Sequence, residues 1–505
     1  MNCVPVRQLF RRVTVQHLWA VVILVGVFIF VNTHPIRPHD FWWHIAVGRE
    51  IRTTGQIPHL DTYSYTAPGA PYASYQMFWL MEVVLYTIYR IGGPALIVFH
   101  QSLVITSAYL LIFLTALRGT NHWRLSAFGL LFAATLGLND WNVRPQVITF
   151  LLGAAFIYLI QRLRAGGRHT WAVLFPLGML VWVNSHGSFP IGLLVIGLWL
   201  GDELWKFISA RWIRHDPISA KNILLPGMIL LVSTLTCLIN PRGFGIFQYL
   251  HAMGENTVVQ ELVVEWAPPR LNTLNGGFFL GALLLTLVIL AVSPRRPTFY
   301  QLGAFLCLAG LGLATSRGIV WYGLVMGSIV AEHSCAILGA IRSHIRPGKE
   351  SAGSPAITWA IIVIISALSI ISLPWFKDWL PMPAEKAGLI SMETPVAATE
   401  FLQINQPPGN LFHAMSFGSY LIWAAQPEYR VFVDSRIELY PETVWRDYLE
   451  ISAAVGDWEG RLQEYDVRTL MLSRMEQPGL VMAAKGSNNW ELVYEDAAAL
   501  IFIAR

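Results

Sequence analysis

The segment LWAVVILVGVFIFVNTHPIRPHDFWWH, Leu18–His44, joins an apolar run to a polar and aromatic stretch. Basic residues, Arg7, Arg11 and Arg12, precede the apolar run Leu18–Val31. This pattern imitates a secretory signal, but no small-residue cleavage site follows it. The segment therefore predicts an uncleaved first transmembrane helix that leads into a large loop.

The whole chain is unusually apolar. It has 505 residues, of which 54% are hydrophobic and 13% charged, with a mean hydropathy of +0.50, far from the composition of a soluble globular protein. A membrane-spanning helix needs roughly 20 apolar residues. Runs of about this size predict roughly eleven spans, centred near residues 25, 105, 131, 152, 177, 197, 231, 285, 307, 328 and 365.

Lysine and arginine residues orient these spans. If the N-terminus is cytoplasmic, every predicted cytoplasmic loop carries basic residues, which agrees with their retention on that side of a membrane. An odd number of spans then places the C-terminal segment outside the cytoplasm. We expect a transmembrane domain over residues 1–373, with a large first outside loop over 34–80, and an extracytoplasmic α/β domain over 374–505.

The segment 374–505 alternates between strand-like and helix-like pieces. The expected strands are Asn410–Ala414, Arg430–Val433, Thr469–Leu472 and a final pair within Trp490–Ile503, and the expected helices are Tyr420–Ala425 and Thr443–Ala454. Alternation of this kind favours a small α/β sheet. FVDSRIELYP, Phe432–Pro441, places Asp434 and Arg436 at the end of a strand, as a binding edge or as a structural ion pair.

Asp40 is the first catalytic candidate. It follows the first membrane helix, and a helix that starts there places His44 on the same face, beside tryptophans suited to the headgroup region. A carboxylate at this position can deprotonate an acceptor hydroxyl or hold a divalent cation. The alternative is that Asp40 only caps the N-terminus of an interfacial helix.

Three arginines lie at the outer ends of predicted helices, where the charge bias disfavours them: Arg144 in NDWNVRPQ, Arg242 in NPRGFG and Arg317 in TSRGIVWY. Ionisable groups at membrane depth are costly, and guanidinium groups match phosphate oxygens. Together they predict a phosphate-sugar or pyrophosphate site. The alternative is that each arginine reaches lipid headgroups or pairs with a local acid such as Asp140.

Further candidate binding residues belong to the outside segments. His186 in WVNSHGSF lies at a helix break, Glu265 lies in QELVVEWAPP, and Asp61 is the next loop acid after Glu50. A packed histidine and a solvated loop acid are the alternatives for His186 and Glu265.

The net charge of +4 comes without a concentrated basic face, which excludes nucleic acid as a partner, and the four cysteines lack metal or disulfide spacing.

The set HDFWWH, RPQ, WVNSHGSF and VDSRIELYP, with an acid just after the first helix, resembles an uncharacterised bacterial subgroup of GT-C integral membrane glycosyltransferases. The resemblance is to the mannosyltransferase-like and aminoarabinose-transferase-like members. It implies a polyprenyl-phosphate sugar donor, Asp40 as base or metal ligand, and Arg144, Arg242 and Arg317 on the phosphate. It also implies a multi-pass protein of the bacterial cytoplasmic (inner) membrane.

The sequence departs from this family in one respect. Many members carry two neighbouring acids in the first loop, whereas here His39 precedes Asp40. A divalent cation is therefore left open as a cofactor. The acceptor, whether glycan, lipid or protein, is also open.

Two other classes of function compete. One is a transporter or flippase of an anionic lipid or solute, and the other is a non-catalytic scaffold. Transport predicts ionisable residues deep within the membrane, whereas the polar residues here cluster at the outer face. Surface chemistry is therefore favoured.

Overall fold

The computed structural model describes residues 14–211, 221–343 and 354–505. Arg7, Arg11 and Arg12, which helped to orient the chain, lie outside the described residues. The bundle consists of α2 (Val15–Thr33), α4 (Ser74–Thr120), α5 (Trp123–Gly137), α6 (Val147–Arg164), α7 (Leu174–Val183), α8 (Phe189–Ser209), α9 (Lys221–Thr236), α12 (Leu274–Val292), α13 (Phe299–Ala314), α14 (Gly318–Arg342) and α15 (Pro355–Ile371). Each predicted span centre falls within one of these helices.

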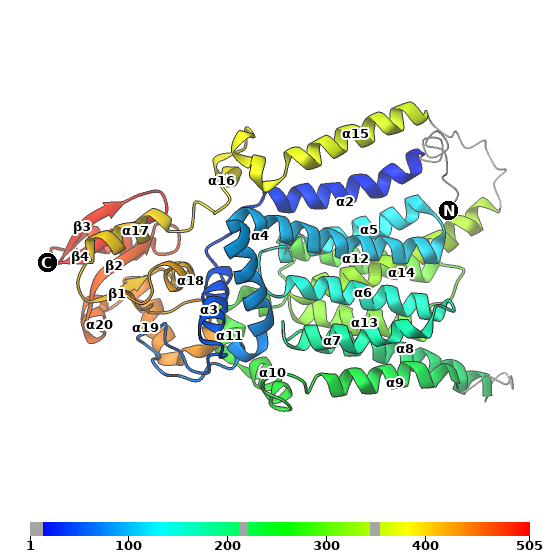
Figure 1. Ribbon diagram of the computed structural model, residues 1–505, viewed down its shortest axis with the longest axis horizontal. Helices are drawn as coiled ribbons and strands as arrows, with labels where there is room; N and C mark the ends of the chain where they lie inside the picture. Colours follow the sequence, from blue (N-terminus) through cyan, green and yellow to red (C-terminus); the bar gives the residue numbers. More distant parts are fainter. Residues whose placement is uncertain (1–13, 212–220, 344–353) are drawn as a thin grey trace.

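Five of these helices, α2, α4, α6, α12 and α14, are long and apolar enough to cross a membrane by length and composition. The total number of crossings stays a prediction. The bundle helices run along the long axis of the molecule, whereas α3 (Phe41–Thr54) and the first part of α4 lie across the end of the bundle (Figure 1). Helix α4 changes direction at Gly92 and Gly93, where Gly93 has a φ of 59° and Pro94 follows.

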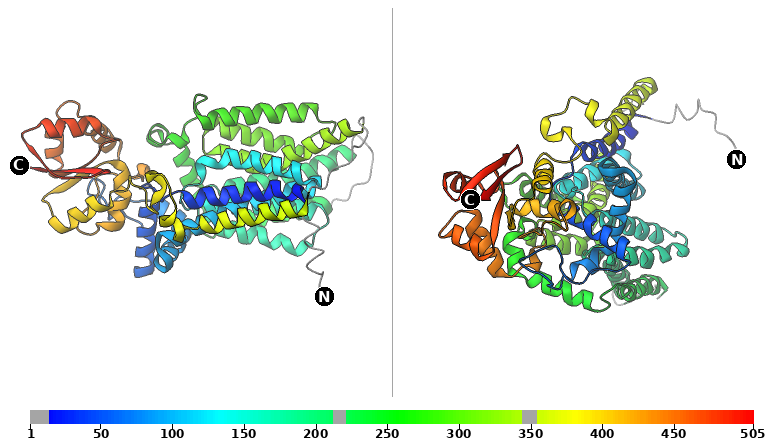
Figure 2. Two further views of the ribbon diagram at one scale, coloured as in Figure 1. Left: turned by 90° about the horizontal axis from the view of Figure 1, so that it is seen from above. Right: turned by 60° about the vertical axis from the view of Figure 1, so that its left-hand side comes forward.

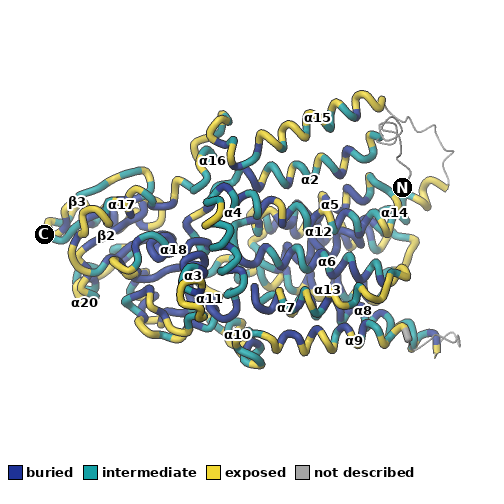
Figure 3. The backbone as a smooth tube through the Cα atoms, in the orientation of Figure 1, coloured by how far each residue is buried: buried dark blue, intermediate teal, exposed yellow. Residues whose placement is uncertain are grey.

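The centre of the bundle is closely packed. An added Cβ on Gly129 of α5 would lie 2.2 Å from the carbonyl oxygen of Gly327 of α14, so only glycine allows this approach. Helices α2 and α15 lie side by side at one edge of the bundle (Figures 1 and 2). Exposed residues follow the outer faces of α15 and α9, whereas the inner helices are mostly buried (Figure 3). Apolar outer faces of this kind suit contact with lipid.

The C-terminal segment forms a small sheet covered by helices. Strands β1 (Asn410–His413), β2 (Val467–Ser473), β3 (Trp490–Glu495) and β4 (Ala499–Ala504) pair in the order β1-β2-β4-β3. Strands β1 and β2 are parallel, and the other pairs are antiparallel. The helices are α17 (Val396–Asn405), α18 (Met415–Ala424), α19 (Glu442–Ser452), α20 (Trp458–Glu464) and α21 (Pro478–Gly486).

The prediction of a strand over Arg430–Val433 is wrong. This segment makes one isolated bridge, between Val431 and Ser64 of the long loop that follows α3. The backbone N–H of Val431 donates to the carbonyl of Tyr63 at 3.0 Å, and the N–H of Tyr65 donates to the carbonyl of Val431 at 3.2 Å. The β-branched run therefore pairs with a distant loop instead of the sheet.

The segment over residues 34–80 and the C-terminal segment share one hydrophobic core. At its centre Arg436 is fully buried, with Nη1 2.6 Å from Oδ1 of Asp61. The same guanidinium holds both oxygens of Asp434, at 2.9 Å from Nε and 2.6 Å from Nη2. Asp434 and Arg436 are thus a structural pair, and Asp61 ties the loop to it. A buried arginine between two carboxylates fixes the position of the C-terminal segment over the bundle end.

Candidate active site

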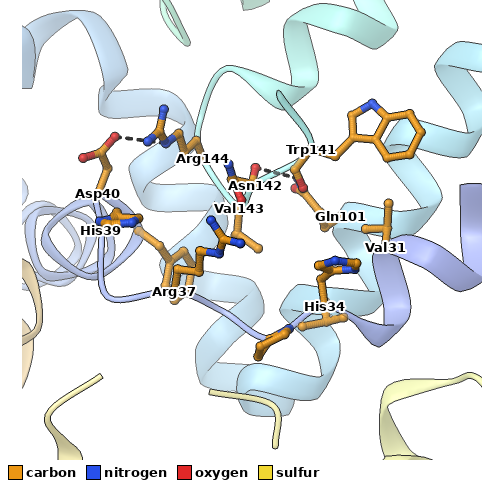
Figure 4. A pocket seen from close by; sticks show the side chains of 13 residues that line it. Val31, His34, Arg37, His39, Asp40, Gln101, Trp141, Asn142, Val143 and Arg144 are labelled. Atoms are coloured by element: carbon orange, nitrogen blue, oxygen red, sulfur yellow. Dashed lines mark hydrogen bonds and ion pairs between the residues drawn. The ribbon is translucent and has the colours of Figure 1, made fainter. Parts of the chain in front are cut away.

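The side chain of Asp40 is engaged with an arginine. Asp40 is the N-cap residue of α3, but its side chain makes no capping hydrogen bond. Its Oδ2 lies 3.1 Å from Nε of Arg144, which comes from the loop before α6 (Figure 4). A pocket of about 450 Å³, its open mouth included, lies beside this pair and is lined by His34, Arg37 and His39 among others.

Glu265 joins two of the predicted arginines. Nη1 of Arg144 donates to both carboxylate oxygens of Glu265 at 2.7 Å. Arg317 reaches Oε2 of Glu265 with Nε at 2.9 Å and with Nη2 at 2.8 Å. The backbone N–H of Arg317 also donates to the carbonyl of Glu265 at 3.2 Å. Asp40, Arg144, Glu265 and Arg317 thus form a chain of alternating charges, which we call the charged cluster.

The charged cluster retains donors for a ligand. Within the described part of the chain, Nη2 of Arg144 and Nη1 of Arg317 have no hydrogen-bond partner. Three helices also begin beside the adjoining cavity, because Gln146, Ser188 and Arg317, the N-cap residues of α6, α8 and α14, line it. Free guanidinium donors and helix N-termini both favour an anion.

The carboxylates of the cluster are ionised at neutral pH. Burial opposes ionisation of Asp40, but Arg144 and several smaller contributions together outweigh it and lower the pKa of that carboxyl to about 2. Burial likewise opposes ionisation of Glu265, but Arg144 and Arg317 lower its pKa below the usual value. The cluster is therefore charge-balanced before any ligand arrives.

Asp140 behaves differently, although it lies close to the same groups. Burial and the charge of Glu265 raise the pKa of Asp140 to about 8, against the opposing effect of Arg317 and Arg144. Asp140 ends the 3-10 helix η1 (Leu138–Asp140) and lines the cavity beneath the cluster. Sequence reasoning considered this residue only as a partner for arginine, whereas a pKa near the working pH is typical of functional sites.

The two predicted histidines are neutral and face the same space. His44 is buried, with Nδ1 3.0 Å from Oε1 of Glu82, and desolvation lowers its pKa to about 3. Nδ1 of His186 accepts from the backbone N–H of Ser188 at 3.1 Å, so the ring proton is on Nε2. Desolvation, with Arg317 nearby, lowers the pKa of His186 to about 3. His186 therefore offers one N–H donor at neutral pH.

Arg242 and Asp61 lie apart from the charged cluster. Nη1 of Arg242 donates to Oε1 of Gln76 at 3.0 Å, and its guanidinium lies over the ring of Tyr249. Asp61 is 2% exposed and accepts from Arg436 and Ser64. The structure thus brings together Arg144 and Arg317, and neither Arg242 nor Asp61 lines the space around them.

The charged cluster lines a cleft of about 1210 Å³, its open mouth included, together with His44 and His186. A second cavity, of about 1000 Å³ on the same measure, has mostly apolar walls. We call these the cleft and the apolar cavity. Apolar side chains of the second space are Phe150, Ile191, Leu250, Leu311, Val320 and Trp321. Lining residues common to both are Phe78, Gln146, His186, Met253, Trp266, Arg317 and Glu438. The cleft and the apolar cavity therefore lie next to each other, one with charged walls and the other with mostly apolar walls.

The C-terminal segment supplies part of this space. Ser435, Ile437 and Glu438 line the cleft, and Ser435 contributes to the low pKa of Asp40. The sequence predicted that Asp434 and Arg436 of FVDSRIELYP form either a binding edge or a structural pair, and the structure shows them as an ion pair. Those two residues point at each other inside the protein, whereas the residues beside them face the cleft. Only the tertiary structure separates the two sets.

The described residues include no group of three His, Cys, Asp or Glu side chains that converges on a point suited to a metal ion. The immediate charged neighbour of Asp40 is the guanidinium of Arg144. A cation beside Asp40 therefore stays a prediction.

No family model matches this sequence. No curated protein matches it either. Solved structures are similar in fold. The oligosaccharyltransferase of Archaeoglobus fulgidus in the apo form matches with a TM-score of 0.53 at 11% identity, over 94% of this chain and 73% of that chain. Arabinofuranosyltransferase AftD from Mycobacteria matches with a TM-score of 0.56 at 12% identity, over 97% of this chain and 42% of that longer chain.

ArnT from Cupriavidus metallidurans, bound to undecaprenyl phosphate, gives a TM-score of 0.48 at 14% identity, over 96% of this chain and 97% of that chain. The first two matches cover almost all of the present chain, from the membrane helices to the C-terminal sheet. At these identities the likeness concerns the fold. The chain therefore shares the fold of these two glycosyltransferases, in agreement with the GT-C resemblance of its sequence.

Proposed function

We propose that this protein transfers a sugar from a polyprenyl-phosphate donor to an acceptor at the outer face of the cytoplasmic membrane. The observation that carries the proposal is that the cleft, lined by the charged cluster, adjoins the mostly apolar cavity and shares lining residues with it. A polyprenyl-phosphate sugar has an anionic headgroup, which suits the charged cleft, and a long apolar chain, which suits the apolar cavity. Two neighbours in fold, an oligosaccharyltransferase and an arabinofuranosyltransferase, support a glycosyl-transfer reaction.

Arg144 and Arg317 would bind the phosphate through their free donors, and the N-termini of α6, α8 and α14 would add to the favourable field. The prenyl chain would enter the apolar cavity, where each buried CH₂ contributes about 0.8 kcal/mol. His186 would donate its Nε2–H to an oxygen of the headgroup. Each group of the donor thereby meets a side chain of complementary chemistry.

In the reaction, an acceptor hydroxyl oxygen attacks the anomeric carbon of the sugar. The bond from that carbon to the phosphate oxygen breaks, and the phosphate leaves with the electron pair and remains on the arginines. Asp40 receives the proton of the acceptor hydroxyl. Attack from the face opposite the leaving phosphate inverts the anomeric configuration.

The pairing of Asp40 with Arg144 regulates the strength of this base. With a pKa of about 2, the free carboxylate is a weak proton acceptor. A phosphate bound to Arg144 neutralises part of the charge that holds the pKa of Asp40 down. The carboxyl then becomes a stronger base only when the donor is in place, which limits unproductive proton transfer.

The test measures release of polyprenyl phosphate by full-length protein in lipid, from a panel of polyprenyl-phosphate sugars with candidate acceptors. Asp40→Asn is compared with Asp466→Asn, a matched control at an exposed position with a φ of 49°, which asparagine tolerates. We expect release by wild type and by the control, and a fall of about 100-fold or more in Asp40→Asn.

Equal release by Asp40→Asn and wild type would remove Asp40 from the chemistry. Absence of release with every donor, combined with movement of the intact lipid across the bilayer, would replace the transferase with a flippase.

A further inference from the structure

Glu438 lies where the cleft meets the apolar cavity, and it lines both. It belongs to the short 3-10 helix η6 (Ile437–Leu439) of the C-terminal segment. We propose that Glu438 binds a hydroxyl group of the sugar that is transferred, and so makes the C-terminal segment part of the sugar-specificity site. This inference rests on the proposed function and deepens it.

The two oxygens of Glu438 are used unequally. Oε1 accepts from the hydroxyls of Tyr72 at 2.9 Å, Ser74 at 2.8 Å and Tyr249 at 3.4 Å. Among the residues that the structure describes, none donates a hydrogen bond to Oε2. The three hydroxyls fix the carboxylate in one orientation, and the second oxygen remains available to a ligand. A carboxylate accepts hydrogen bonds only, so that ligand must bring a donor.

Charge decides which part of the donor lies against Glu438. A phosphate is repelled by a carboxylate and attracted by the free donors of Arg144 and Arg317. A prenyl chain offers no hydrogen-bond donor. The sugar ring, which is bonded to the phosphate, carries hydroxyl donors and lies within the same cleft. Glu438 therefore suits the sugar, while the charged cluster suits the phosphate.

A structural role for Glu438 is distinguished by the choice of substitution. In Glu438→Gln the amide oxygen still accepts from Tyr72, Ser74 and Tyr249, so these hydroxyls orient the side chain as before. The open position changes from an acceptor to an NH₂ donor. The matched control is Glu442→Gln, at an exposed glutamate four residues further along that pairs with Arg446.

The experiment uses full-length protein in lipid and the best neutral-sugar donor of the panel, together with its monodeoxy analogues. We expect Glu438→Gln to lower kcat/KM for the intact donor by about 10- to 100-fold. For one deoxy analogue, which lacks the hydroxyl that Glu438 binds, wild type and Glu438→Gln should have equal kcat/KM. The Kd for polyprenyl phosphate without a sugar, and the thermal unfolding midpoint, should match those of Glu442→Gln.

Wild-type kcat/KM in Glu438→Gln would overturn the inference and leave the proposed function intact. The same is true of an equal loss for the intact donor and for all deoxy analogues, because that result indicates a structural role. If wild type releases no polyprenyl phosphate from any donor, the proposed function fails first, and this inference fails with it.

Discussion

The Nε atom of Arg144 lies 3.1 Å from Oδ2 of Asp40, so the proposed base is paired with a proposed phosphate ligand before substrate arrives. On its other side, Arg144 holds Glu265 through two contacts of 2.7 Å. One guanidinium therefore connects the acid that would take the proton with the site that would take the leaving phosphate. This connection makes the geometry of Arg144 more important than its charge alone.

Arg144→Lys should lower kcat/KM by about 100-fold, because a lysine ammonium cannot reach Asp40, Glu265 and a phosphate with one planar fork. The measurement is release of polyprenyl phosphate in lipid. Arg446→Lys, an exposed arginine paired with Glu442, serves as the control and should keep the wild-type rate. Full activity of Arg144→Lys would show that a positive charge is sufficient.

Glu265→Gln should tighten binding of polyprenyl phosphate and slow turnover. The glutamate neutralises Arg144 and Arg317 in the free protein, and a ligand phosphate must compete with it. Removing that charge should lower the Kd for polyprenyl phosphate about 3- to 10-fold, and slow product release should reduce kcat. Weaker binding in Glu265→Gln would mean that the glutamate mainly positions the arginines.

Donor binding should weaken in alkaline solution because of Asp140. Its pKa is raised to about 8, so it is mostly neutral at pH 7 and mostly charged at pH 9. The new negative charge near Arg144 and Arg317 competes with the donor phosphate, and we expect KM to rise several-fold between these pH values. Asp140→Asn should abolish this rise. If KM of Asp140→Asn still rises over the same pH range, the rise is due to the ionisation of another group.

Arg436→Gln should destabilise the attachment of the C-terminal segment. The substitution leaves Asp61 and Asp434 buried without their cation, which typically costs about 3–5 kcal/mol. The measurements are thermal unfolding in detergent and proteolysis within residues 55–73. Arg461→Gln, whose arginine is partly exposed and pairs with Asp447, should change both much less. Equal sensitivity of the two variants would contradict a central role for Arg436.

The helices and the position of the first loop follow from the sequence because their signals are local. Each predicted span centre lies within a helix. A run of about 20 apolar residues favours a membrane-spanning helix whatever the rest of the chain does. The strands at Asn410–His413 and Val467–Ser473 were predictable from short strand-like runs for the same reason. Asp40, Arg144 and Arg317 were identifiable as costly polar groups beside apolar runs.

The partners of these residues were decided by the tertiary structure. Glu265 is 121 residues from Arg144 and 52 from Arg317, and Asp61 is 375 residues from Arg436. Nothing local separates Glu265, which holds two arginines, from a solvated loop acid, or Arg242, which stands apart, from Arg317. Val431 likewise pairs with Ser64 and not with the sheet. The sequence by itself determined which charged residues lie beside apolar segments, where burying a charge costs free energy. The fold decided which of them meet, because ion-pair energies depend on distances that only the folded chain sets.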